Sequence, residues 1–138
     1  MKFSANASLF VVSILLVACA AKSSDEEQVR ELIANVETAA EARDVSDVLE
    51  YVSDDYADSN GLDVAQLRDF LRGYFLAHPK LELVASIESL EFPVDGLAQA
   101  VVTVATVELG DPALQRLKVE FRRVKGKWRV ARADRAAR

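Results

Sequence analysis

The hydrophobic period of the chain changes once, at Pro79, and this change restricts the possible folds more than any other feature. Before Pro79, apolar residues recur at spacings of three and four, as on one face of an α-helix. After Pro79 they alternate with polar residues, as in strands with one buried face. A block of helices followed by a block of strands is typical of an α+β domain, in which helices cover one face of an antiparallel sheet.

Three helices are predicted before the change. Each begins after a residue whose side chain can cap the first backbone N–H groups. These residues are Ser24, Asp44 and Asp63. The first helix ends near Arg43. The third ends at His78, because a residue before proline avoids the helical conformation. An acidic loop, residues 54–61, separates the second helix from the third.

Four strands are predicted after the change. Residues 81–87, 98–109 and 116–122 form the first three, and Trp128 and Val130 point inward from the fourth. Asp95–Gly96 and Lys125–Gly126–Lys127 are turn signals, which predict an antiparallel meander. Residues 24–138 therefore form a single domain.

Two segments of this domain carry a resemblance to a known family. Residues 54–63 read Asp-Asp-Tyr-x-Asp-x-x-Gly-x-Asp, and a hairpin runs from Phe121 to Val130. With the order of elements, they resemble the nuclear transport factor 2-like superfamily, which implies three helices clasped by a curved antiparallel sheet in a cone. The superfamily includes ketosteroid isomerase, polyketide cyclases, dehydratases and members without known activity, so the fold selects no function.

The first residues read as an export signal. Residues 9–18 contain only one polar side chain, Ser13, and are too few for the roughly 20 residues that span a bilayer. Leu16-Val17-Ala18-Cys19 resembles the lipobox of bacterial lipoproteins. The resemblance implies a signal peptide over residues 1–18, a lipid such as palmitate on Cys19 and a tether over residues 19–23. Ala20 after the cysteine implies an outer-membrane anchor facing the periplasm. The alternative is a secretory peptide with an incidental cysteine.

Composition excludes several classes of function. The formal net charge of −5 argues against nucleic acid as a partner. A single cysteine excludes an internal disulfide framework, and a single histidine excludes a histidine-rich metal site. The sequence predicts neither a metal nor a cofactor.

The enzymes that the chain resembles place a carboxylate or an Asp/His pair inside the cone. Asp55, Asp58 and His78 are the weak candidates for this role. The alternatives are turn chemistry for the two aspartates and a helix C-cap for the histidine. Five further residues are candidates for lining a pocket, with a core or ion-pair role as the alternative: Tyr56, Tyr74, Trp128, Arg132 and Asp134. Alternation directs Arg132 and Asp134 toward the mouth of the cone.

Three functions are compatible with these residues. The first is an envelope lipoprotein that binds a small apolar ligand or a protein without catalysis. The others are a small isomerase- or cyclase-like enzyme and a purely structural envelope module. Residues 98–109 are apolar on both faces, which predicts a homodimer through the sheet, because the helices cover one face only.

Charge is divided unevenly along the chain. Residues 19–112 carry 6 basic and 20 acidic side chains, whereas residues 113–138 carry 10 and 2. Alternation predicts that six basic residues share the uncovered face of the sheet: Arg116, Lys118, Arg122, Lys127, Arg129 and Arg135. This basic face either pairs with Glu82, Glu88 and Glu91 or contacts anionic lipid headgroups.

Overall fold

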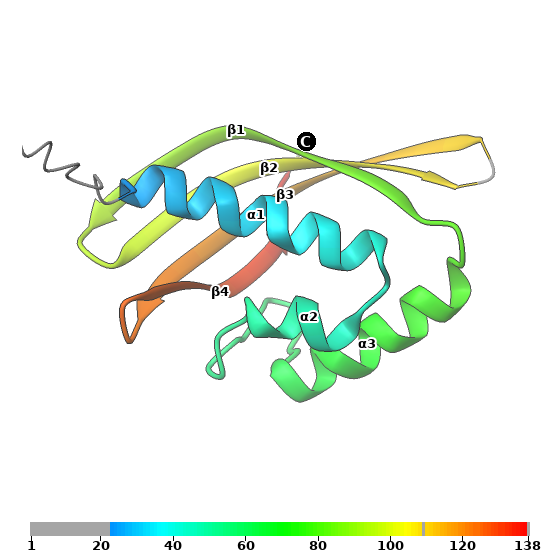
Figure 1. The fold of residues 1–138 in the computed structure, drawn as a ribbon, viewed down its shortest axis with the longest axis horizontal. Coiled ribbons are helices and arrows are strands. Elements are labelled where there is room, and N and C mark those ends of the chain that lie inside the picture. The colour runs from blue at the N-terminus through cyan, green and yellow to red at the C-terminus, as the bar shows by residue number, and fades with distance from the viewer. Residues whose placement is uncertain (1–22, 109, 138) are drawn as a thin grey trace, which may run out of the picture.

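The computed structural model describes residues 23–108 and 110–137, so the predicted signal peptide and Cys19 lie outside the described residues. Three helices precede four strands, as the change of period predicts (Figure 1). The elements are α1 (Asp25–Glu41), α2 (Val45–Glu50), α3 (Val64–Ala77), β1 (Glu82–Val94), β2 (Leu97–Glu108), β3 (Asp111–Val124) and β4 (Lys127–Arg135). The α+β fold class is confirmed.

The predicted caps define the helices. The Ser24 hydroxyl accepts a hydrogen bond from the Glu27 N–H (3.2 Å), and the Glu27 carboxylate accepts one from the Ser24 N–H (3.3 Å). Asp63 forms the equivalent pair with Gln66 at the start of α3. These reciprocal bonds satisfy N–H groups that have no partner inside a helix.

The four strands form one antiparallel sheet in the order β1-β2-β3-β4. One face, the inner face, packs against α1. The core on this face consists of Val29, Leu32, Ala98, Ala100, Val102, Phe121 and Trp128. Val29 and Phe121 are fully buried, so the protein's own side chains pack this part of the space between α1 and the sheet. The opposite face is the outer face.

A β-bulge changes the orientation of the last strand. Phe121 pairs with Val130, but the preceding Glu120 pairs with Arg132, which leaves Ala131 as an extra residue. An extra residue reverses the alternation beyond it. Arg132 and Asp134 therefore share the outer face with Glu120 and Lys118. The predicted direction of Arg132 and Asp134 toward the cone mouth is wrong.

The same bulge removes Arg135 from the predicted basic face. Arg135 pairs with Leu117, whose alternation with Phe121 places it on the inner side of the sheet. Arg135 is therefore separated from the other five basic residues, which remain on the outer face.

The chain itself covers part of each edge of the sheet. Along β4, Ser53 donates a backbone hydrogen bond to the carbonyl of Val130 (2.8 Å) and Ala57 donates one to that of Ala131 (3.2 Å). Along β1, the Ala85 N–H donates to the carboxylate of Glu37 in α1 (2.9 Å). Among the described residues, no helix is both long and apolar enough to cross a membrane.

Candidate functional site

A groove of about 410 Å³ lies on the outer face. Its volume is within the range of about 300–1,000 Å³ that is typical of small-molecule sites. All four strands contribute to its lining, which consists of Ser89, Glu91, Gln99, Ala100, Val101, Lys118, Val119, Glu120, Arg132 and Asp134. Most of these side chains are polar or charged, so the groove suits a polar ligand.

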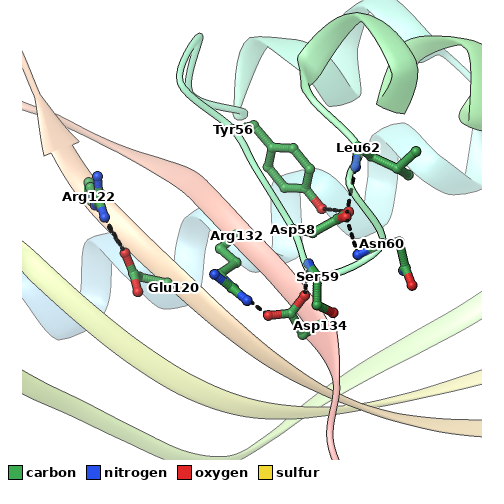
Figure 2. A network of polar contacts seen from close by, with 9 residues as sticks. All are labelled: Tyr56, Asp58, Ser59, Asn60, Leu62, Glu120, Arg122, Arg132 and Asp134. Atoms are coloured by element: carbon green, nitrogen blue, oxygen red, sulfur yellow. Dashed lines mark hydrogen bonds and ion pairs between the residues drawn. The ribbon is translucent and has the colours of Figure 1, made fainter.

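The loop between α2 and α3 supports the β4 side of this groove. Its Asp58 accepts three hydrogen bonds: from the Tyr56 hydroxyl (2.8 Å) and from the backbone N–H groups of Asn60 (2.9 Å) and Leu62 (3.1 Å) (Figure 2). Burial, and then the hydrogen bond to Asp58, raise the pKa of the Tyr56 phenol well above its ordinary value. Asp58 therefore holds the loop in shape, as the turn alternative predicts.

Asp134 links this loop to the groove. One carboxylate oxygen accepts a hydrogen bond from the Ser59 N–H (2.7 Å), and the other is paired with Arg132 on the same strand (Figure 2). These two contacts lower the pKa of Asp134 to about 2, and the hydrogen bond from the Ser59 N–H has the larger effect. Asp134 therefore remains charged at neutral pH and holds Arg132 in place within the groove.

Two charged side chains in the groove remain available for a ligand. Arg132 is engaged by Asp134, and Glu120 by Arg122 on the same strand (2.8 Å). Within residues 23–108 and 110–137, neither Lys118 nor Glu91 makes an ion pair. They lie on β3 and β1, on opposite sides of β2, and Val101 and Gln99 of β2 lie between them.

The three acid–base candidates do not meet inside the cone. Asp55 is exposed, and its backbone N–H donates to the Ser53 hydroxyl (3.3 Å). Asp58 is engaged within its loop. His78 is the C-cap of α3, and its ring lies edge-on to that of Tyr74, with 4.1 Å between the ring centroids. In the described parts of the chain, no three His, Cys, Asp or Glu side chains are grouped so that they could hold a metal ion.

The other aromatic candidates lie in two separate places. Tyr74 packs within α3 against Phe70 and Phe75. Trp128 is buried under α1, where its indole N–H donates to Asp25 (3.2 Å). It lines a smaller cavity of about 170 Å³ between α1 and the β3–β4 hairpin. The pocket candidates are therefore distributed over the domain, and Arg132 and Asp134 are the two that line the groove.

The basic face is partly neutralised by the protein. Arg116 binds Glu88 across β2 with an N–O distance of 2.7 Å. The pKa of Glu88 lies below its ordinary value, mainly because Arg116 donates hydrogen bonds to its carboxylate and secondly because Thr103 donates one. Arg122 is paired with Glu120. In the described chain, Lys118, Lys127 and Arg129 have no ion-pair partner.

Three polar residues of the groove, Ser89, Gln99 and Glu120, were not among the predicted site residues, and Glu91 was predicted only as a partner of the basic face. The charged residues at alternate positions of β3 were a signal that the outer face of the sheet is polar there. Their convergence depends on the strand register, which alternation alone does not supply.

Several solved structures share this arrangement. A protein of unknown function from Nostoc punctiforme, described as having a cystatin-like fold, is 19% identical with a TM-score of 0.68, over 80% of this chain and 89% of that chain. A protein of unknown function from Shewanella oneidensis, described as nuclear transport factor 2-like, is 14% identical with a TM-score of 0.68, over 83% and 100%. The fold is nuclear transport factor 2-like.

A further structural neighbour carries an enzyme's name. The putative scytalone dehydratase of Novosphingobium aromaticivorans is 11% identical with a TM-score of 0.65, over 81% of this chain and 84% of that chain. At such identities the likeness shows the fold and leaves the function open. No protein-family model matches the sequence, and no relative is found among curated proteins.

Proposed function

We propose that the protein is an envelope lipoprotein, anchored by an acylated Cys19 in the outer membrane and facing the periplasm. The lipobox-like Leu16–Cys19 supports the anchor, because the single cysteine of the chain occupies the acceptor position. Several acyl chains on one residue would exceed the two membrane-binding signals needed for stable attachment. In this proposal the domain is a binding module without catalytic activity.

The position of the groove carries the binding proposal. In the cone, Val29 and Phe121 are fully buried and Trp128 is only 4% exposed. An acid or base tuned for catalysis is usually buried beside its substrate. Here Asp58 and Asp134 are instead engaged by protein hydrogen bonds and His78 ends a helix. The outer groove therefore offers the better binding site.

The charges of the groove indicate the class of ligand. Lys118 can receive an anionic group, and Glu91 can receive a cationic group on the other side of β2. We therefore propose a small ligand that carries both charges, as a free amino acid or short peptide does. This proposal replaces the small apolar ligand expected for a hollow cone.

Native mass spectrometry of the full mature protein, extracted from membranes in mild detergent, tests this function. Wild-type protein and the control Lys80→Glu, an exposed lysine outside the groove, should retain a species of added mass. Lys118→Glu should lose it, because its carboxylate repels the anionic end of the ligand. Equal retention by Lys118→Glu, or no added mass in the wild type after incubation with amino acids and dipeptides, would contradict the proposal.

A further inference from the structure

We infer that the domain contacts the lipid surface through one end of its sheet, which we call the tether end. The tether end consists of residues 94–97 in the β1–β2 hairpin, residues 122–129 in the β3–β4 hairpin, Phe92 and the start of α1. This inference rests on the proposed lipid anchor and adds an orientation to it: the partner is an anionic phospholipid surface.

Arg123 connects the parts of the tether end. Its guanidinium binds Asp25 at the start of α1 (3.0 Å) and Asp95 in the β1–β2 turn (3.1 Å). Its backbone N–H donates to the carbonyl of Gly96 (2.9 Å). Both hairpin turns therefore lie at the start of α1, close to the residue that leads into the tether (Figure 1).

Exposed apolar side chains occur at the tips of both hairpins. Val94 is 61% exposed, Val124 is 42% exposed and Phe92 is 38% exposed. Phe92 packs against the buried Trp128, with 5.8 Å between ring centroids. Apolar and aromatic side chains on projecting turns can enter the boundary between headgroups and acyl chains, which aromatic residues favour.

Basic side chains accompany these apolar tips. The register joins Val94 to Leu97, Leu97 to Arg122 and Arg122 to Arg129, so one row across the four strands is half apolar and half basic. Residues 94–97 and 122–129 together contain five basic side chains and one acidic side chain, a balance of +4 that becomes +1 when the three carboxylates at the start of α1 are counted. Each basic residue near an anionic surface strengthens membrane binding.

The acidic side chains at the start of α1 are engaged within the protein. Asp25 binds Arg123 and Trp128, and Glu26 pairs with Arg30 (2.9 Å). Glu27 belongs to the capping box of α1. These bonds partly offset the repulsion between the three carboxylates and anionic headgroups. The lysines of the β3–β4 turn, by contrast, have no ion-pair partner among the described residues.

The opposite end of the sheet is also apolar, since Leu114 is 73% exposed and Val84 is 59% exposed. Its hairpin, residues 107–114, has two acidic residues and no basic residue. The five steps from Cys19 to Ser24 reach at most about 18 Å. The 12 residues of β2 extend for about 40 Å, which is longer than the tether. The tether therefore holds the tether end of the sheet nearer to the membrane than the opposite end.

A single labelled cysteine can report which end meets the lipid. Acylation of Cys19, the one cysteine of the chain, would leave no free thiol, so Val94→Cys, Val124→Cys and the matched control Leu114→Cys can each carry one environment-sensitive fluorophore. The full mature protein is reconstituted in vesicles of one anionic to three neutral phospholipids, with brominated acyl chains as quenchers. We expect quenching at positions 94 and 124 to be at least about threefold greater than at position 114.

The outcomes separate the anchor from the orientation. If the protein does not float with the vesicles, the lipid anchor fails and the orientation with it. If the protein floats but position 114 is quenched as strongly as positions 94 and 124, the anchor stands and the orientation is overturned. Lys125→Glu combined with Lys127→Glu should reduce quenching at position 94 by at least about half, whereas Lys80→Glu should not. Unchanged quenching at position 94 in the variant with both lysines replaced would also overturn the role of the basic side chains at the tether end.

Discussion

Asp134 should contribute stability that depends on pH in a defined direction. Its pKa falls from an ordinary 3.8 to about 2 in the folded protein. Because the folded value is the lower one, the stabilisation is complete above about pH 5 and is lost as the pH falls from 3.8 toward 2. Replacement by asparagine retains an oxygen for the Ser59 N–H but removes the charge that attracts Arg132.

The size of this effect follows from the two pKa values. Their difference of 1.8 corresponds to about 2.4 kcal/mol, at about 1.36 kcal/mol for each pH unit. The side chain of Arg132 is 49% exposed, so solvent screening reduces the expected contribution to about 1 kcal/mol. Roughly half of it should remain at pH 3.

Urea unfolding of the chain from Ser23, which contains both core clusters, measures the effect. The wild type should exceed Asp134→Asn by about 1 kcal/mol in free energy of unfolding at pH 7, and the difference should shrink toward pH 3. Asp69→Asn is the control, because Asp69 is 78% exposed and lies 4.0 Å from Arg72. A difference that is independent of pH, or an equal loss in Asp69→Asn, would refute the assignment.

Two other predictions concern attachment and assembly. Labelled palmitate should enter the wild-type protein in cells and should be absent from Cys19→Ala; equal labelling of both would exclude the anchor. The chain from Ser23 should be a dimer by light scattering at high micromolar concentration, through the outer face of the sheet at the end away from the groove, where Val84 and Leu114 are exposed. Ala105→Glu should shift it to monomer, because Ala105 pairs with both of these residues and a charge there would be buried on pairing. A monomeric wild type contradicts this interface.

The helices and the order of strands could be predicted because their signals are local. Ser24 and Asp63 each precede a residue that completes a capping box, and both boxes form. The change of hydrophobic period at Pro79 separates the helices from the strands without reference to distant residues. Such features depend on backbone hydrogen bonds within a few positions, so the sequence specifies them directly.

The last strand shows what local patterns do not specify. Strict alternation from Trp128 directs Arg132 and Asp134 inward, yet the bulge at Ala131 turns both outward. The cost of burying two charged side chains in an apolar interior favours the bulge. The groove depends on this shift, because it places Arg132 beside Glu120 across the β3–β4 pair. A charged residue that strict alternation would place in the core was therefore the signal, in the sequence, for this bulge.

The partly covered edges of the sheet would have a consequence for copies of the protein held on a membrane by the proposed anchor. The proposed lipid anchor would confine many copies to one surface, where neighbouring chains would meet often. Open strand edges would then join copies through backbone hydrogen bonds, as in aggregation. Here the backbone of residues 53–57 occupies β4, and Glu37 of α1 binds an N–H of β1. For copies crowded in this way, strand addition would be hindered along β4 and at the start of β1.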